Sequence, residues 1–193
     1  MELINRIRNL SENTCEILGK GNMVLTDIIS SPYPGASVIP ALCTATFDRR
    51  LLTGETEESV LAPIRECINE MSLESSDFQA EVSIAESTIK TYTKCEGNHR
   101  KFAPAWLMDK ELPVVQDSLK ALRAADFADV KIGTYSFCTN GSCSAGVRNI
   151  PTIGFGPSKE ELAHINDEFI EVQELEGAYE GYYALMNAIA GEC

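Results

Sequence analysis

The sequence predicts an α/β protein in two parts, each of which combines helices with a small sheet. Segments with apolar residues at helical spacing alternate with segments in which every second residue is apolar. Turns rich in proline and glycine separate these segments. Residues 94–110 show no periodicity and interrupt the pattern near the middle of the chain, whose 193 residues are enough for one large or two small domains.

The first part begins with a predicted helix and two strands. Apolar residues at helical spacing predict an amphipathic helix over residues 1–19, which ends at Gly19 and Gly21. Strands are expected over residues 22–30 and 38–50, paired antiparallel across a proline-containing turn. In the second strand, polar residues that include Asp48 and Arg50 fall on one face. The apolar face, which we expect the helices to cover, carries Ile39, Ala41, Cys43, Ala45 and Phe47.

A second helix and a third strand follow. The run from Thr53 to Glu58 has a capping hydroxyl and an acidic first turn. Pro63 predicts a kink or a later start of this helix, because an interior proline removes a hydrogen bond. An alternating strand is expected at residues 78–93. The apolar positions of the helix are Val60, Ile64, Ile68 and Met71.

The order helix, strand, strand, helix, strand predicts a small α/β sandwich with an antiparallel sheet. It lacks only a first strand to be a full βαββαβ unit. We expect residues 94–110 to be a linker, and domains at residues 1–96 and 97–193.

The second domain is expected to contain a helix at residues 113–125, strands at 130–138 and 152–155 around a glycine-rich turn, and a final helix. This alternation is typical of the edge of a parallel-type sheet, which holds ligands at its strand ends. The apolar stripe predicted for the final helix is Ala178, Tyr182, Leu185 and Ile189.

Charge and cysteine usage restrict the partners. A formal net charge of −13 repels phosphate backbones and anionic membrane surfaces, so no nucleic acid and no membrane partner is expected. The absence of a membrane-spanning run and of a signal-peptide pattern predicts a cytoplasmic protein. The cysteines number seven and include no Cys-x-x-Cys, so most are expected to be small buried side chains. Cys138 and Cys143 are either a redox or ligand pair or simply part of loop and core packing.

The segment from Ile150 to Pro157 is followed by a candidate metal ligand, His164. A short apolar strand is predicted here and ends in Gly-x-Gly-Pro. The loop after this strand carries His164, which is flanked by carboxylates. The alternative is an ordinary solvated or hydrogen-bonded histidine. The chain has only two histidines, and the other, His99, lies among charged residues of the linker. A catalytic metal would therefore need ligands from elsewhere.

Three motifs follow one another along the chain. They are Val38-Ile39-Pro40 leading to Phe47-Asp48-Arg49-Arg50 and Gly54-Glu55-Thr56, then Thr139-Asn140-Gly141-Ser142-Cys143-Ser144-Ala145, then Gly154-Phe155-Gly156-Pro157 leading to Ala163-His164 and Glu168. In order and spacing they resemble the motifs of the M20 family of metallopeptidases, which includes di-zinc aminoacylases, deacetylases and carboxypeptidases. The Asp-Arg-Arg-Leu, Gly-Glu-Thr and Ser-Ala-Gly runs look most like the selenium-metabolism-linked hydrolase branch.

The resemblance implies a partial ferredoxin-like lid or dimerisation domain, followed by the C-terminal portion of a zinc-exopeptidase-like α/β catalytic domain. It implies that His164 is a zinc ligand and that Arg50, oriented by Asp48, binds a substrate carboxylate. Thr139 and Gly141 would line the substrate pocket. Many members of the family have asparagine where this chain has Ser37, directly before the Val-x-Pro.

The implied function is that of a fragment of a metal-dependent amidohydrolase, a peptidase or N-acyl amino acid deacylase, in which water activated by two zinc ions attacks an amide. The family's other zinc ligands and its catalytic glutamate lie in the N-terminal half. We therefore expect no catalytic residue in this chain, no activity from it alone, a homodimer through the lid, and the N-terminal half as a possible partner. The alternative is a non-catalytic module for dimerisation or small-carboxylate binding.

Overall fold

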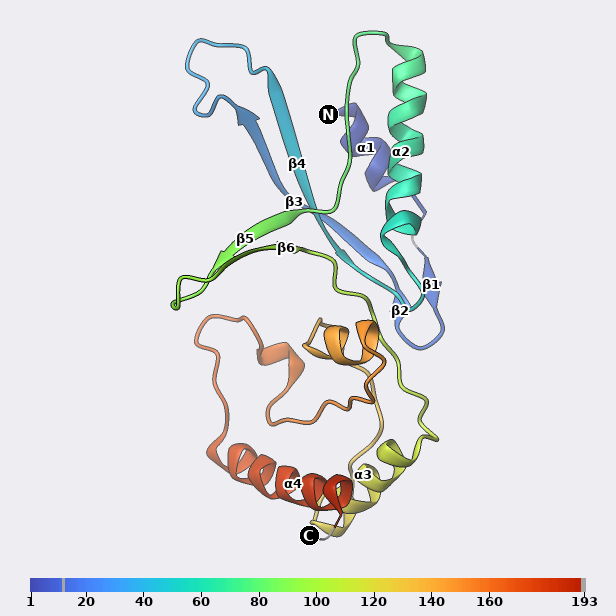
Figure 1. The fold of residues 1–193 in the computed structure, drawn as a ribbon, viewed down its shortest axis with the longest axis vertical. Coiled ribbons are helices and arrows are strands. Elements are labelled where there is room, and N and C mark those ends of the chain that lie inside the picture. Colours follow the sequence, from blue (N-terminus) through green and yellow to red (C-terminus); the bar gives the residue numbers. More distant parts are fainter. Residues whose placement is uncertain (12, 192–193) are drawn as a thin grey trace. The chain divides into compact units, whose positions relative to one another are not determined.

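The computed structural model describes residues 1–11 and 13–191, and the chain divides into two compact units, Met1–Ala105 and Trp106–Cys193 (Figure 1). Met1–Ala105 is unit 1, and Trp106–Cys193 is unit 2. The chain is mixed α/β with small antiparallel sheets, which agrees with the predicted class. Within the described residues, the six strands form three two-stranded sheets.

The first helix, α1, spans Glu2–Arg8, so the prediction of a helix through residue 19 is wrong. Beyond Asn9 the chain forms a small antiparallel hairpin of β1 (Thr14–Cys15) and β2 (Gly19–Lys20). Asparagine, serine and threonine bond readily to nearby backbone, and they are frequent here, which favours turns over helix. Residue 12 of the predicted helix lies outside the described residues.

The strands β3 (Asn22–Ser31) and β4 (Leu42–Arg50) pair antiparallel, as predicted. Ala45 and Phe47 are half-buried on the expected face, whereas Ile39, Ala41 and Cys43 are exposed. The prediction is wrong at these three positions because the helices cover only the part of the ribbon that includes Met23 and Phe47.

The second helix, α2, spans Glu57–Glu74 and begins where a capping box closes. Thr56 Oγ1 accepts a hydrogen bond from the Ser59 amide at 3.2 Å, and Ser59 Oγ accepts one from the Thr56 amide at 2.8 Å. The helix continues through Pro63, so the later start is wrong. The predicted apolar positions are confirmed as buried: Val60, Ile64, Ile68 and Met71.

The core of unit 1 lies between these helices and one face of the β3–β4 ribbon (Figure 1). Ile7 of α1 meets Ile64 and Ile68 of α2. Partly buried residues that pack against this cluster are Leu3, Leu10, Met23, Phe47, Phe78 and Val82. The two helices are also joined at their surface by Arg6, which contacts Glu74 at 2.5 Å.

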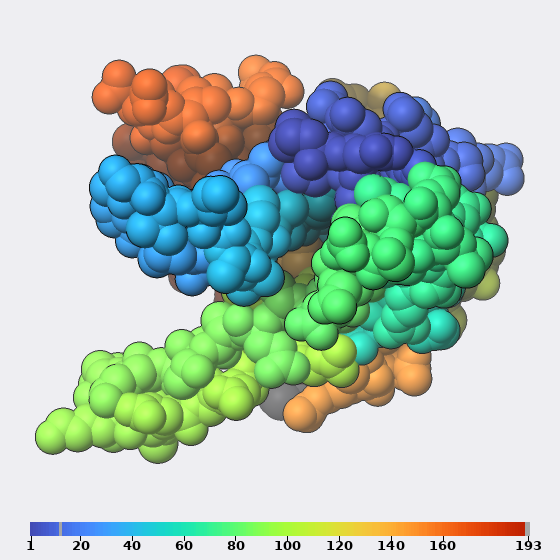
Figure 2. Space-filling view, turned by 90° about the horizontal axis from the view of Figure 1, so that it is seen from above, coloured from blue at the N-terminus to red at the C-terminus, as the bar shows by residue number. Residues whose placement is uncertain are grey.

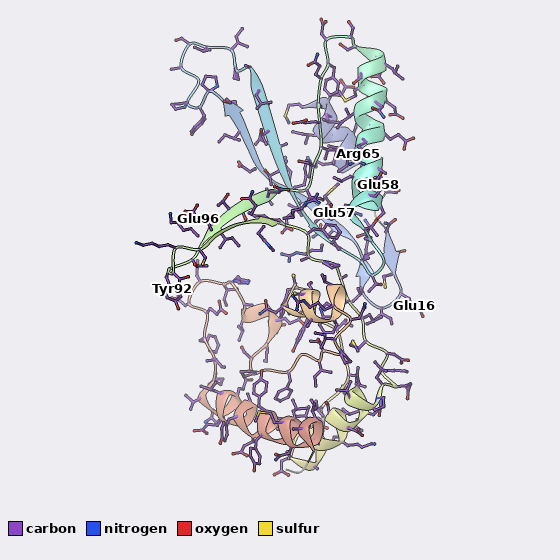
Figure 3. The ribbon with its side chains drawn as sticks, in the orientation of Figure 1. Glu16, Glu57, Glu58, Arg65, Tyr92 and Glu96 are labelled. Carbon is purple, nitrogen blue, oxygen red and sulfur yellow. The ribbon has the colours of Figure 1, made fainter. Side chains whose placement is uncertain are left out.

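The single strand expected at residues 78–93 is wrong. Residues 86–90 form β5 (Glu86–Lys90), which turns back to pair with β6 (Glu96–Arg100). The turn is closed by a hydrogen bond from the Thr91 amide to the Cys95 carbonyl. This hairpin projects from unit 1 as an arm (Figure 2), with Tyr92 at its tip (Figure 3). The expected linker therefore includes a strand, and His99 lies on it.

Unit 2 contains the two predicted helices, α3 (Pro113–Ala124) and α4 (Val172–Ala190). The strands predicted at 130–138 and 152–155 are absent from the described residues of this unit. A strand needs a neighbour to complete its hydrogen-bond ladder, and neither segment has one here. The glycine-rich turn forms a helical turn, η1 (Ser142–Val147), and a second short turn is η2 (Glu160–Leu162).

The core of unit 2 is small. Val115 and Leu122 of α3 are buried, as are Ala178 and Leu185 of α4. The predicted stripe of α4 is confirmed at Ala178 and Leu185, but Tyr182 and Ile189 are exposed by 47% and 55%.

The cysteines are less buried than predicted. Cys67 is buried, Cys15 is half-buried, and Cys43, Cys95, Cys138 and Cys143 are exposed. Cys193 lies outside the described residues.

Among the helices of residues 1–11 and 13–191, none is long and apolar enough to cross a membrane.

One carboxylate links three segments of unit 1. Glu55, whose side chain is 7% exposed, accepts hydrogen bonds from Arg49 Nη2 at 2.5 Å, Asn13 Nδ2 at 2.8 Å and the Leu52 amide at 2.9 Å. Burial raises the pKa of Glu55, but these hydrogen bonds and the charge of Arg49 outweigh it, so the net pKa is below its ordinary value.

Replacing Glu55 by glutamine is expected to destabilise unit 1 in a pH-dependent manner. Because the folded-state pKa is depressed, the carboxylate contributes stability above its unfolded pKa, and this contribution is lost as the pH falls through the folded pKa. At pH 7 we expect Glu55→Gln to cost about 1–3 kcal/mol in urea unfolding.

The cost should shrink at pH 3. Glu58→Gln is the matched control, because Glu58 and its partner Arg65 are both exposed (Figure 3), so it should cost no more than about 1 kcal/mol at pH 7. A cost of equal size at pH 3 and pH 7 would contradict this role for the ionised carboxylate.

Two glycines of α4 provide a matched test of packing in unit 2. A Cβ at Gly181 would lie 2.5 Å from the Phe155 ring, whereas one at Gly177 would meet the Phe127 ring only at 4.0 Å. Gly181→Ala is therefore expected to destabilise by about 1–3 kcal/mol through overpacking. Gly177→Ala should stabilise by about 0.5–1 kcal/mol, because alanine favours the helix. Thermal unfolding of both variants measures the difference, and equal effects would refute it.

Candidate functional site

Asp48 and Arg50 lie next to each other on the exposed face of β4. Arg50 Nη2 is 3.4 Å from Asp48 Oδ2, and each side chain is 53% exposed. An exposed ion pair of this kind contributes little to stability. The guanidinium is therefore held loosely by one carboxylate and can turn to an anionic group from outside.

The preceding residue, Arg49, points to the opposite face and has a structural partner. It makes the ion pair with Glu55, and its Nε is buried without a hydrogen-bond partner among the described residues. Successive side chains of a strand point to opposite faces, so Arg49 has a structural partner and Arg50 is exposed. Sequence reasoning missed Arg49 and the anchoring role of Glu55, although Glu55 stands inside a quoted motif.

Ser37, directly before the Val-x-Pro, has a φ of 59°. This is the left-handed region, which asparagine adopts more readily than serine. The backbone conformation at position 37 therefore restricts which residue fits there, in addition to any restriction by a ligand.

Thr139 and Gly141 are brought together at the start of η1. The Gly141 amide donates a hydrogen bond to Thr139 Oγ1 at 3.1 Å. A Cβ at Gly141 would lie 2.3 Å from the Trp106 ring, so glycine is required here by the indole. A place in the substrate pocket is not needed to explain this glycine. Trp106 was missed by the sequence analysis; as the sole tryptophan of the chain it is the signal that could have pointed to this contact.

Cys138 and Cys143 do not form a disulfide and both are exposed. Cys138 Sγ lies 3.5 Å from Ser142 Oγ instead. Both alternatives for this pair stay predictions.

The Gly-Phe-Gly-Pro motif is held by aromatic contacts. Tyr135 covers Gly154, where a Cβ would lie 2.3 Å from the ring, and Tyr182 donates a hydrogen bond to the Phe155 carbonyl at 2.5 Å. Burial, and after it the charges of Tyr182 and Glu160, raises the pKa of Tyr135. The Ser136 hydroxyl donates to Glu160 at 2.6 Å. These contacts fix the segment that leads toward His164.

His164 is exposed and has a φ of 64°, an uncommon backbone conformation for a residue other than glycine. Its amide donates a hydrogen bond to Glu168 Oε2 at 3.0 Å. The His164 side chain is therefore exposed on a constrained turn, and the Glu168 carboxylate accepts a hydrogen bond from the His164 backbone.

Whether a zinc ion fits depends on the ligand side chains that are present. Residues 1–11 and 13–191 contain no group of three or more His, Cys, Asp or Glu that could hold a metal ion. A catalytic zinc uses three protein ligands and an open position. The described residues therefore do not fit a catalytic zinc by themselves, and His164 is at most one ligand among several.

The predicted site residues thus form two pairs and one single residue. Asp48 lies beside Arg50 in unit 1, Thr139 lies beside Gly141 in unit 2, and His164 has its hydrogen bond with Glu168. Their functional roles stay predictions.

Comparisons with known proteins give the first part a family context. Residues 1–76 match the family model of the M20 peptidase dimerisation domain. Relatives in Escherichia coli K12 and O157:H7, both called uncharacterized protein YgeY, are 29% identical over 153 residues, which is 79% of this chain and 36% of theirs. The chain thus spans about a third of their length, and no solved structure matches it. Unit 1 therefore contains a segment similar to the dimerisation domain of M20 peptidases.

Proposed function

We propose that this chain is part of a metal-dependent amidohydrolase of the M20 type, to which it contributes the dimerisation lid and one metal ligand. The observation that carries the proposal is the match of residues 1–76 to the peptidase dimerisation domain. That domain indicates a peptidase-family member and homodimer formation. The specific branch linked to selenium metabolism stays a prediction, as does the division into a lid at residues 1–96 and a catalytic portion at 97–193.

The second unit supports a metal-ligand role for His164. Its loop is anchored on both sides, by the aromatic contacts at Gly154 and Phe155 and by the bond to Glu168. A constrained left-handed turn at a polar residue is a feature of functional sites. In the proposed complete enzyme, zinc would polarise an amide and activate water, and the imidazole of His164 would be one of its ligands.

Arg50 is the proposed contact for a substrate carboxylate. Its planar guanidinium can bind a carboxylate through two parallel hydrogen bonds, which suits peptides and N-acyl amino acids. Asp48 at 3.4 Å would position it, and the exposure of both groups leaves room for a ligand. Thr139 and Gly141 would lie at the pocket wall.

A second candidate function is a non-catalytic module that dimerises and binds a small carboxylate. It is favoured by the same lid match together with the missing metal-ligand cluster in the described residues. The DNA just upstream discriminates between the two. A segment that encodes His-x-Asp and Glu-Glu would support the hydrolase, and unrelated sequence would support the module.

Metal binding tests the hydrolase proposal directly. We expect the purified chain to hold far less than one equivalent of zinc and to show no amide hydrolysis. Adding the upstream-encoded half should restore both. His164→Ala should then lower zinc affinity by about tenfold or more, whereas His99→Ala, on the exposed β6 strand, should not. Tight stoichiometric zinc and hydrolysis by the chain alone would disprove it.

Kinetics of the restored enzyme test Arg50. Arg50→Gln is expected to raise KM for substrates with a free carboxylate by about tenfold or more, because a charge-assisted pair is lost. Arg65→Gln, which removes another exposed arginine on α2, is the control and should leave KM unchanged. An unchanged KM in Arg50→Gln would remove this residue from the substrate site.

A further inference from the structure

The turn that contains Thr139 and Gly141 also contains the single Asn-Gly dipeptide of the sequence, Asn140-Gly141. An asparagine is converted to aspartate when the backbone nitrogen of the next residue attacks its side-chain carboxamide carbon. A glycine in the second position accelerates this reaction, because it has no Cβ that hinders the approach of its nitrogen. The sequence of this turn is therefore intrinsically prone to deamidation.

The carboxamide of Asn140, which is the group under attack, is free in the structure. The Asn140 side chain is exposed, and it makes no hydrogen bond with another residue of the part of the chain that the structure describes. Neither burial nor a hydrogen bond to these residues thus holds the side chain away from the Gly141 nitrogen.

The peptide group that carries the attacking nitrogen is held at both of its polar atoms. The Gly141 amide donates a hydrogen bond to Thr139 Oγ1 at 3.1 Å. The Asn140 carbonyl accepts hydrogen bonds from the amides of Cys143 at 3.0 Å and Ser144 at 3.3 Å. A peptide group moves as one plane, so its nitrogen cannot turn toward the Asn140 side chain unless these bonds break.

Gly141 is also covered by the ring of Trp106. The glycine is buried, and a Cβ at this position would lie 2.3 Å from the indole. A larger residue, which would slow the attack, therefore does not fit here. Burial also limits the access of water or hydroxide to the amide proton. The turn thus retains the labile dipeptide and depends on its local contacts for chemical stability.

We propose that Asn140 is a latent deamidation site, and that the hydrogen bond from the Gly141 amide to the Thr139 hydroxyl suppresses its conversion. When that bond opens, the Gly141 nitrogen loses its proton to water and forms a bond to Asn140 Cγ. The Cγ–Nδ2 bond then breaks, the nitrogen departs with a proton from water as ammonia, and a cyclic succinimide remains. Water cleaves the succinimide at either carbonyl and gives aspartate or isoaspartate. The net reaction consumes water and releases ammonia in equal amounts.

Conversion changes both the charge and the backbone of this turn. Either product places a carboxylate at position 140, and isoaspartate also inserts the side-chain methylene into the main chain. In isoaspartate the original main-chain carbonyl, which the Cys143 and Ser144 amides bond in the native turn, becomes a free carboxylate. We therefore expect η1 to loosen irreversibly after conversion. The inference is independent of the proposed function, because neither zinc nor substrate takes part in it.

Peptide mapping by liquid chromatography and mass spectrometry tests the proposal on the full chain, incubated at mildly alkaline pH either folded or in guanidinium chloride. It measures the aspartate and isoaspartate that accumulate at position 140. Conversion in the folded chain should be at least about tenfold slower than in the denatured chain, because it requires local opening of the turn. Equal rates in the two conditions would overturn the proposal, since the fold would then give no protection.

Variants of Thr139 isolate the hydrogen bond. Thr139→Val removes the hydroxyl acceptor at nearly the same side-chain size. In the folded chain it should convert Asn140 about threefold to tenfold faster than the native sequence, which corresponds to the loss of one hydrogen bond. Thr139→Ser is the matched control, because it keeps the acceptor and should convert at the native rate. Tyr182→Phe removes a hydroxyl hydrogen bond elsewhere in unit 2 and should also convert at the native rate.

The denatured variants separate the hydrogen bond from a direct effect of the neighbouring side chain. In guanidinium chloride, Thr139→Val should convert at the rate of the denatured native chain. A folded Thr139→Val that is as slow as the native sequence, or one that is faster by the same factor in both conditions, would contradict the proposal. Equal acceleration by Thr139→Val and Tyr182→Phe would assign the protection to the overall stability of unit 2 and would reject it as well.

Hydrogen exchange of the native chain provides a test that needs no variant. The Gly141 amide should exchange at least about tenfold more slowly than in the denatured chain, because its hydrogen bond to Thr139 must open first. A Gly141 amide that exchanges as fast in the folded chain as in the denatured chain would overturn the proposal even if Thr139→Val failed to fold.

Discussion

The buried carboxylate of Glu55 is the interaction on which the organisation of unit 1 depends. It lies in the turn between β4 and α2 and bonds to the strand through Arg49, to the region before β1 through Asn13, and to the turn itself through Leu52. Burying a charge is favourable only when it is paired and fully hydrogen-bonded. Because Glu55 meets both conditions, it fixes the turn between the end of β4 and Thr56, the N-cap residue that directly precedes α2.

The same anchor decides which arginine is available for binding. Strand alternation places Arg49 on the side of Glu55 and Arg50 on the exposed face beside Asp48. A buried, paired guanidinium cannot leave its partner without leaving a charge unpaired, whereas an exposed pair can exchange partners at little cost. The structural role of one arginine thus makes the other the candidate for a substrate carboxylate.

Unit 2 is organised differently, because aromatic rings pack directly against glycines. Trp106 covers Gly141, and Phe155 covers Gly181. These contacts hold the two motif segments in place, although the few buried aliphatic residues leave most apolar surface of α4 exposed. Unit 2 thus positions its motif segments through local packing of aromatic rings against glycines.

The sequence by itself determined the features that depend on local signals. Helical periodicity and capping located α2, α3 and α4, and alternation with a proline turn located the β3–β4 pair and the exposed side of Asp48 and Arg50. The end of α1 at Arg8, the β5–β6 hairpin and the loss of strands at 130–138 and 152–155 were decided by tertiary structure. A strand exists only with a partner, and the partner is a property of the fold, not of the segment. The metal-ligand role of His164 stays a prediction, because the described residues bring no further ligands to it.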